Sequence, residues 1–277
     1  MEPPVGTTAR WVQARLRAAG CVFAEDEARL LISAATPADL TSMVERRAAG
    51  EPIEHVIGWA EFCGMRIAVD PGVFVPRRRT EFLVAHAIAL TRPRAVVLDM
   101  CCGSGAIGAA IAATIGVIDL HAVDRDPLAV ACARRNVATA AGEVSQGDLY
   151  DAVPASLHGR VDVLVANAPY VPTDDIALMP AEARVYEPRV ALDGGPDGLD
   201  VQRRVIDGAP SWLATRGCLL IETSAPQAHQ TEEAFVSSGL SARVETSDAL
   251  GATVVIGTRP SDAPEIVRES PRISESS

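Results

Sequence analysis

Apolar residues gather in short runs that suit buried β-strands, and the clearest run leads into a glycine-rich turn. Residues 96–98 are apolar or β-branched and precede Asp99, as expected for a central strand of a parallel sheet. Gly103 and Gly105 follow, and residues 106–113 are helix formers and small apolar residues. Such a helix turns its free N–H groups toward the space beyond the strand, where we expect a small cofactor.

The same alternation of strands and helices continues along the chain and predicts an α/β fold with a Rossmann-like, doubly wound sheet. We expect further strands at 116–123, 143–147, 161–166, 217–222, 242–246 and 253–258, and helices from Glu81 onward and at 128–141, 200–213 and 227–238.

The chain before this alternation has helical spacing instead. We expect helices at 9–19 and 25–35 and a third from Thr36-Pro37 to Ala49, then a short hairpin or irregular linker at 50–70. This divides the chain into a helical domain at 1–50, a hairpin linker at 51–75, the α/β domain at 76–260 and a disordered tail at 261–277. The helical domain is either a platform for a macromolecular partner or a packing cap.

Two polar segments lie outside the predicted strands. Residues 184–200 form a polar loop that is long enough to be a functional flap. Arg77, Arg78 and Arg79 precede the helix that starts at Glu81. They could face a ligand, but a solvated helix start is the expectation.

Composition narrows the choice of partners and location. The chain has no apolar run long enough to cross a membrane and no signal-peptide pattern at its start, so we expect a cytoplasmic protein. A net charge of −11 disfavours broad binding to phosphate backbones and makes nucleic acid an unlikely substrate class. The six cysteines lack metal-ligand spacing, so we expect small core residues and no metal site.

The glycine turn leaves the type of cofactor open. Gly103, Gly105 and Gly108 match the G-x-G-x-x-G spacing of dinucleotide sites, but a cofactor without phosphates would need the same open turn. Asp124, at the end of the second strand, could accept both hydroxyls of a ribose. Asp148 follows the third strand and could take an adenine amino group or serve as a turn residue. A tight turn with no ligand is the remaining alternative.

The fourth strand delivers Asn167-Ala168-Pro169-Tyr170 at its carboxyl end, where open parallel sheets bind ligands. Together with Asp99, Gly103-Ser104-Gly105, Asp124 and Asp148, this order resembles the motifs of class I S-adenosylmethionine-dependent methyltransferases, and residues 167–170 resemble the Asn-Pro-Pro-Tyr of enzymes that methylate a planar nitrogen. Residues 50–58, 69–77 and 186–199 are similar to the protein-(glutamine-N5) methyltransferases, which modify the Gly-Gly-Gln loop of peptide-chain release factors. The resemblance covers roughly residues 50–258.

The resemblance implies S-adenosylmethionine as cofactor, a release factor as protein substrate, no metal, and an antiparallel strand near the C-terminal end of the sheet. The implied cofactor-binding residues are Asp99, Cys101, Gly103, Gly105, Asp124, Asp148, Leu149 and Asn167. The implied catalytic residues are Asn167, Ala168, Pro169 and Tyr170. We expect a monomer or a weak dimer.

Elementary chemistry agrees with this resemblance. An amide nitrogen is a poor nucleophile because its lone pair is delocalised into the carbonyl. The Asn167 side-chain oxygen and the Ala168 carbonyl could accept its two N–H hydrogens and favour the charge that develops during transfer. Pro169 would fix the backbone, and Tyr170 would pack on the planar amide.

The chain departs from the family at four points. Ala168 replaces a usual proline, Cys101 replaces a frequent glycine, and residues 77–81 lack the family's Pro-acid pair between Arg and Thr-Glu. The helical domain is also shorter, which makes a glutamine in another protein the nearest alternative target. An exocyclic amine of nucleic acid and a non-catalytic cofactor-binding protein are the more distant alternatives.

Overall fold

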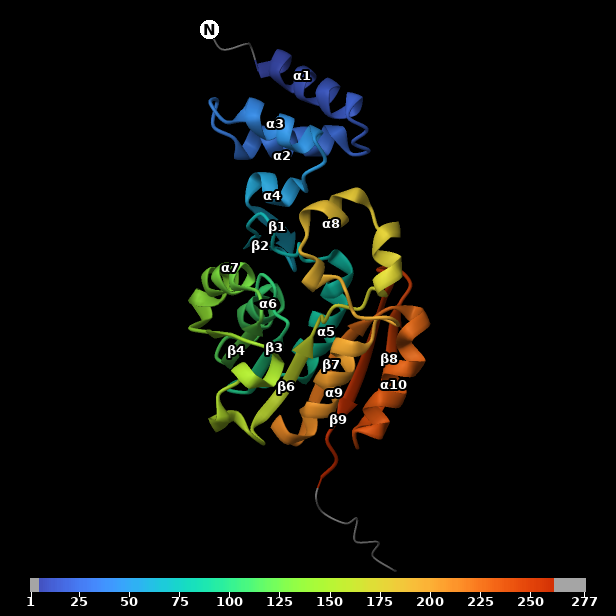
Figure 1. Ribbon diagram of the computed structural model, residues 1–277. Helices are drawn as coiled ribbons and strands as arrows, with labels where there is room; N and C mark the ends of the chain where they lie inside the picture. Colours follow the sequence, from blue (N-terminus) through green and yellow to red (C-terminus); the bar gives the residue numbers. More distant parts are fainter. Residues whose placement is uncertain (1–4, 262–277) are drawn as a thin grey trace, which may run out of the picture.

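The computed structural model describes residues 5–261, which form a small helical unit next to a seven-stranded sheet with helices on both faces (Figure 1). The tail predicted at 261–277 lies outside the described residues apart from Ser261. None of the helices within the described range has the length and apolar composition needed to pass through a bilayer.

The large sheet has the strand order β5-β4-β3-β6-β7-β9-β8, and only the two pairs that include β9 are antiparallel. This confirms the predicted mostly parallel sheet with an antiparallel strand near the C-terminus. The strands are β3 Val96–Met100, β4 Asp119–Asp124, β5 Glu143–Gln146, β6 Val161–Ala166, β7 Leu213–Thr223, β8 Ser241–Ser247 and β9 Ala252–Thr258.

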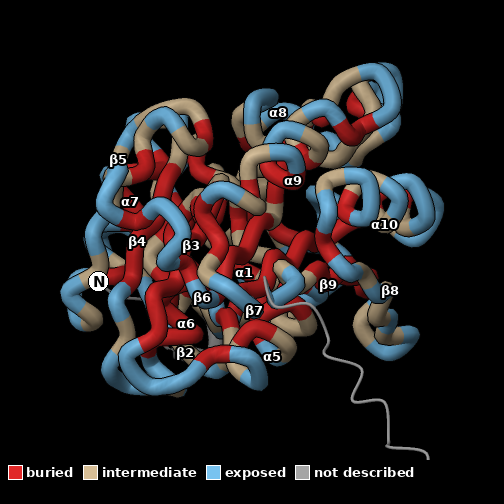
Figure 2. The backbone as a smooth tube through the Cα atoms, turned by 90° about the horizontal axis from the view of Figure 1, so that it is seen from below, coloured by how far each residue is buried: buried red, intermediate tan, exposed pale blue. Residues whose placement is uncertain are grey.

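Alternate residues of the central strands point to opposite faces and build two cores. Val163 and Val165 of β6 pack under α5, α6 and α7, whereas Leu164 and Ala166 pack under α9 and α10. These helices are α5 Glu81–Leu90, α6 Ala106–Ile115, α7 Pro127–Val137, α9 Asp200–Trp212 and α10 Ala228–Ser237. Figure 2 shows the central strands as buried tube within an exposed shell. Burial on both faces explains why these strands are continuous apolar runs in the sequence.

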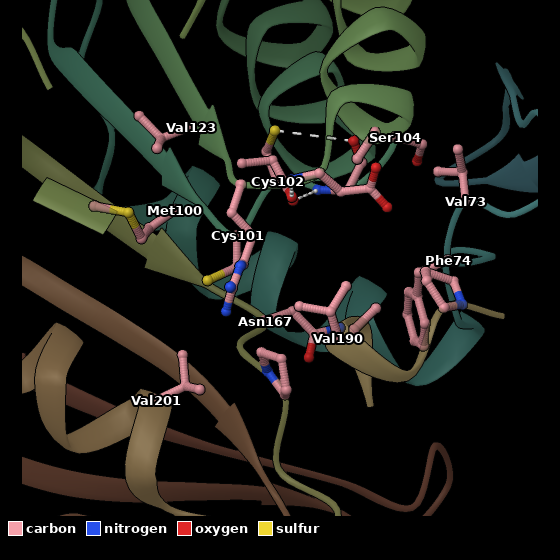
Figure 3. Close-up of a pocket in the computed structure, with 18 of the residues that line it drawn as sticks. Val73, Phe74, Met100, Cys101, Cys102, Ser104, Val123, Asn167, Val190 and Val201 are labelled. Carbon is pink, nitrogen blue, oxygen red and sulfur yellow. Dashed lines mark hydrogen bonds between the residues drawn. The ribbon is translucent and has the colours of Figure 1, made fainter. Parts of the chain in front are cut away.

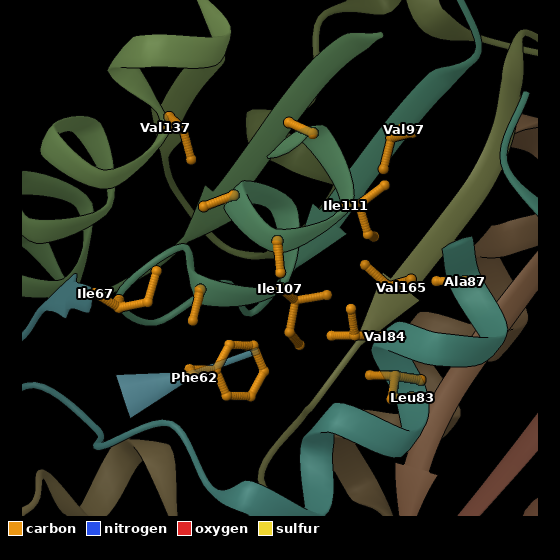
Figure 4. Close-up of a cluster of buried hydrophobic side chains, with 14 of the residues drawn as sticks. Phe62, Ile67, Leu83, Val84, Ala87, Val97, Ile107, Ile111, Val137 and Val165 are labelled. Atoms are coloured by element: carbon orange, nitrogen blue, oxygen red, sulfur yellow. The ribbon is translucent and has the colours of Figure 1, made fainter. Parts of the chain in front are cut away.

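The predicted hairpin is present and belongs to the main core. Strands β1 Trp59–Phe62 and β2 Met65–Ala68 pair as an antiparallel ribbon. The side chain of Phe62 lies next to Ile107 of α6 (Figure 4), and Ile67 belongs to the same buried cluster. The hairpin is therefore part of the hydrophobic core beside α6, and not only a linker between the helical unit and the large sheet.

The helical unit consists of α1 Val5–Ala18, α2 Ala24–Ala34 and α3 Leu40–Ala48, with α4 Ile53–Ile57 beneath them. It has its own core, to which Val12, Leu16 and Leu31 contribute. The third helix begins at Leu40, later than predicted, because Thr36 and Asp39 bond to each other in a turn. The five-residue α4 was not predicted because it is too short to show a helical period.

The polar segment at 184–200 is not the simple loop that the sequence predicts. Helix α8 Ala181–Tyr186 covers its start, and a 3₁₀ turn follows at Arg189–Ala191. The Tyr186 hydroxyl donates to the Ala49 carbonyl, and Glu182 pairs with Arg47, so α8 is attached to the helical unit (Figure 1). Among the α8 side chains only Ala183 is buried, so the sequence of this segment has no amphipathic pattern that would predict a helix.

Candidate active site

The main cavity lies at the carboxyl ends of β3, β4, β5 and β6 and has a volume of about 430 Å³. Between β3 and β6 the strand order reverses, and ligands of open α/β sheets bind at such a point. Figure 3 shows Asn167, Val190 and Phe74 along one side of this cavity and Cys102 and Val123 along another. The lining thus combines the turn after β3 with residues from distant parts of the chain.

The turn after β3 has an open backbone. Cys101, Gly103 and Gly105 all have positive φ angles, of 56°, 54° and 74°. A Cβ on Gly103 would meet nothing within 4 Å, so this side of the turn is open, whereas a Cβ on Gly105 would come within 3.0 Å of Ala133. Gly103 lines the cavity, and Gly105 lets α6 and α7 pack closely behind it.

Asp124 is an acidic residue of the cavity wall that backbone N–H groups hold in place. Its two carboxylate oxygens accept hydrogen bonds from the backbone N–H groups of Gly103, at 2.8 Å, and Asp126, at 2.9 Å. Burial raises the pKa of this carboxyl, and the backbone donors oppose that rise. Each oxygen retains a further acceptor site, so the carboxylate can receive two hydroxyl groups from a bound ribose.

Asp99 lies behind the wall and does not line the cavity. Its Oδ2 accepts from the Gly108 N–H at 2.9 Å, while its fully buried Oδ1 has no partner among the described residues. Burial raises the pKa of Asp99 to about 8, so the carboxyl is largely protonated at neutral pH. Of the predicted cofactor-binding residues, Asp99 and Gly105 are the two that the structure does not bring to the cavity surface.

Asp148 and Leu149 line the cavity after β5, but the Asp148 carboxylate already has a partner. Arg204 of α9 donates to both of its oxygens, at 2.8 and 3.3 Å, and holds the pKa of Asp148 below its ordinary value. Arg204 also lines the cavity. Sequence reasoning missed this residue because it lies on a helix far along the chain from Asp148.

The predicted catalytic motif lies where two cavities meet. Asn167 and Pro169 line the main cavity, and all four residues from Asn167 to Tyr170 line a smaller one of about 40 Å³. The Asn167 Nδ2 group donates to Thr80 Oγ1 at 3.3 Å. No hydrogen bond to Asn167 Oδ1 comes from the part of the chain that the structure describes, so this oxygen is available as an acceptor.

Residues 192–198 pack against the backbone of the segment that follows Asn167. Val171 exchanges backbone hydrogen bonds with Leu192 and Gly194. A Cβ on Gly194 would come within 2.7 Å of the Pro169 carbonyl oxygen, and one on Gly198 within 2.4 Å of the Tyr170 carbonyl oxygen. The glycine cluster of the predicted flap therefore permits close backbone packing beneath the motif.

Tyr170 is held by residues that sequence reasoning did not connect. Its hydroxyl donates to Glu222 Oε1 at 3.1 Å, and Arg79 donates to the same oxygen at 3.2 Å. Glu222 is buried, and its Oε2 has no partner within the described range. Burial, with the nearby Glu222 carboxylate, raises the pKa of the Tyr170 hydroxyl.

The expectation that the three arginines form a solvated helix start is wrong for two of them. Arg79 contacts Glu222, and Arg77 pairs with Glu187, whose side chain is only 1% exposed. Both arginines line the smaller cavity. Their partners lie more than 100 residues away along the chain, so no local pattern could indicate the pairing. Within residues 5–261, no cluster of His, Cys, Asp and Glu could hold a metal ion.

Comparisons with known proteins agree on one family. The "Methyltransferase small domain" family model matches residues 64–195. The chain is 36% identical over 219 residues to a release factor glutamine methyltransferase of Geobacter sulfurreducens, covering 78% of this chain and 76% of that protein. It is 32% identical to one of Bradyrhizobium diazoefficiens, covering 83% and 86%.

Solved structures support the fold alone. A methyltransferase from Pyrococcus furiosus matches with a TM-score of 0.54 at 16% identity, covering 71% of this chain and 90% of that one. A ribosomal protein L11 methylase from Lactobacillus delbrueckii matches with a TM-score of 0.50 at 17% identity, covering 70% and 85%.

Proposed function

The chain belongs to the release factor glutamine methyltransferase family, and from this premise we propose its reaction. It transfers a methyl group from S-adenosylmethionine to the side-chain amide nitrogen of a protein glutamine. The substrate is a peptide-chain release factor, methylated in its Gly-Gly-Gln loop. The observation that carries this proposal is Asn167, which lies between the two cavities with Oδ1 available as an acceptor.

The main cavity fits the proposed cofactor. Its volume of about 430 Å³ is that of a small-molecule site. Asp124 would accept the ribose hydroxyls. Cys101 and Gly103 would lie next to the cofactor in the open turn, and Asp148 and Leu149 would lie beside the adenine. Asp99 and Gly105 would act indirectly by supporting the turn and α6. S-adenosylmethionine supplies an electrophilic methyl group on a sulfonium.

The Asn167 side chain and the Ala168 backbone would grip the target amide. Asn167 Oδ1 and the Ala168 carbonyl would each accept one N–H hydrogen, which orients the nitrogen and stabilises the positive charge that develops on it. Because the second acceptor belongs to the backbone, alanine serves there as well as proline. Pro169 would restrict the local backbone, and Tyr170, anchored to Glu222, would pack on the planar amide.

The helical unit would help to hold the protein substrate. Its attachment to α8 through Arg47–Glu182 and Tyr186–Ala49 supports this role, because α8 leads directly into the 189–193 part of the cavity wall. We therefore assign substrate docking to residues 1–50 and methyl transfer to 76–260, joined by 51–75. The enzyme would work in the cytoplasm, where release factors act, as a monomer or weak dimer, since one chain lines both cavities.

The proposal is tested by incubating the protein with labelled S-adenosylmethionine and purified release factor, followed by peptide mapping. We expect the label on the glutamine of the Gly-Gly-Gln loop and none on a release factor in which that glutamine is replaced by glutamate. No transfer, with cofactor binding verified by calorimetry, would redirect the search to other proteins in a whole lysate. Label found on nucleic acid instead would contradict the proposal.

A further inference from the structure

Thr80 is a buried polar residue next to the proposed amide-binding group. It ends the 3₁₀ turn Arg78–Thr80, just before α5, and its side chain is 2% exposed. It also lines the main cavity. Its Oγ1 accepts the hydrogen bond from Asn167 Nδ2 at 3.3 Å.

The terminal torsion of an asparagine side chain is broad, so packing alone holds the direction of its amide loosely. A rotation of the Asn167 amide would move Oδ1 away from the N–H group of a target amide. The hydrogen bond between Asn167 Nδ2 and Thr80 Oγ1 restricts this rotation.

From this geometry we infer that Thr80 is a positioning residue: its hydroxyl holds the Asn167 side chain in the place from which Oδ1 accepts from the target amide. The inference rests on the proposed function. Thr80 does not touch the reacting atoms in this account and acts only through Asn167.

The backbone around Thr80 is anchored well enough for this task. Arg77 is tied to Glu187 and Arg79 to Glu222, so the turn is fixed on both sides. The next residue, Glu81, accepts from the backbone N–H of Cys63 in the hairpin at 2.9 Å. Thr80 Oγ1 is therefore a preorganised acceptor, because its neighbours are bound to three other segments.

Four substitutions separate a hydroxyl effect from a packing effect. Thr80→Val keeps the shape and removes the hydroxyl, whereas Thr80→Ser keeps the hydroxyl and removes a methyl group. Thr80→Ala provides a second hydroxyl-free variant to compare with Ser. Thr91→Val is the matched control. Thr91 directly follows α5, which Thr80 directly precedes. Its buried hydroxyl donates to the Ala87 carbonyl, away from the cavity lining.

We expect Thr80→Val to lower kcat by about 10- to 100-fold, the typical cost of a misplaced binding group, with the Kd for S-adenosylmethionine within about twofold of wild type. Thr80→Ser should retain most of the activity and exceed Thr80→Ala by about tenfold. Thr91→Val should keep the wild-type kcat. If Thr80→Val does not fold, the comparison of Ser with Ala decides the question. Equal activity of Val and wild type, or of Ser and Ala, would overturn the inference.

A second readout does not need activity. The side-chain amide signals of Asn167, assigned by their loss in Asn167→Ala, should exchange slowly with solvent in wild type and faster in Thr80→Val. Unchanged exchange would show that the hydroxyl does not hold the amide. If the wild type transfers no methyl group to any protein, the proposed function fails, while this measurement still tests the contact between Thr80 and Asn167.

Discussion

The part of the site that we propose for the cofactor (the cofactor half) and the part that we propose for the target amide (the amide half) are built in different ways. In the cofactor half, the strand ends and the turns that follow them supply the wall, and Asp124 is fixed by backbone N–H groups of Gly103 and Asp126. In the amide half, side chains far apart in sequence hold one another, as in Thr80 with Asn167 and Glu222 with Tyr170. The placement of Asp124 should therefore tolerate remote substitutions, whereas Asp148, which Arg204 of α9 holds, and the amide half should not.

The largest expected effect comes from Asn167→Ala, which would break the amide half alone. We expect methyl transfer to fall by at least about 1,000-fold, because one of the two acceptors for the target amide is lost. Cofactor affinity should stay within a few-fold of wild type, since Asp124 and the turn are untouched. Single-turnover transfer and calorimetry measure the two quantities separately, and equal turnover of variant and wild type would refute the amide-gripping account.

Asp124→Ala should give the opposite pattern. The variant removes a charged acceptor for two hydroxyl groups, and at about 1.5 kcal/mol for each hydrogen bond the Kd for S-adenosylmethionine should rise by about 100-fold. At saturating cofactor the rate of transfer should recover most of its wild-type value. Calorimetry and a titration of rate against cofactor concentration check this, and a Kd that does not change would contradict the assigned role of Asp124.

Glu222→Gln tests whether the amide half depends on its distant supports. The amide keeps the size of the carboxylate but removes the charge that binds Arg79 and the Tyr170 hydroxyl. We expect turnover to drop by about tenfold through loss of Tyr170 placement, with unchanged cofactor affinity. A variant that loses cofactor binding instead would show that the two halves are coupled through β7.

Asp99→Asn should have the smallest effect on function and a clear effect on stability. Because burial raises the folded-state pKa of Asp99 to about 8, above that of the unfolded chain, the protonated form stabilises the fold at low pH. That contribution is lost as pH rises from about 4 through about 8. Denaturant unfolding across this range should therefore show a flatter pH dependence for the variant, with cofactor affinity within a few-fold. A large loss of affinity would mean that Asp99 contacts the cofactor after all.

The sequence predicts the residues that directly follow buried strands better than the distant residues that hold them in place, for a physical reason. Asp124 and Gly103 follow buried strands directly, so apolar runs locate them in space without knowledge of the fold. Helix α8 has only one buried side chain, and the partners of Arg77 and Arg79 come from distant segments, so neither leaves a periodic signal. Asp99 lies behind the cavity wall because of how α6 packs against β3. A sequence motif carries no information about this packing.

The most direct test of the central claim identifies the atom that receives the methyl group. Release factor labelled by this protein would be hydrolysed in acid, which frees methylamine from an N-methylated side-chain amide, methanol from a methyl ester, and neither from a carbon-methylated residue. We predict that the label is recovered as methylamine. Recovery as methanol, or retention on an amino acid, would contradict an active site built to grip an amide nitrogen.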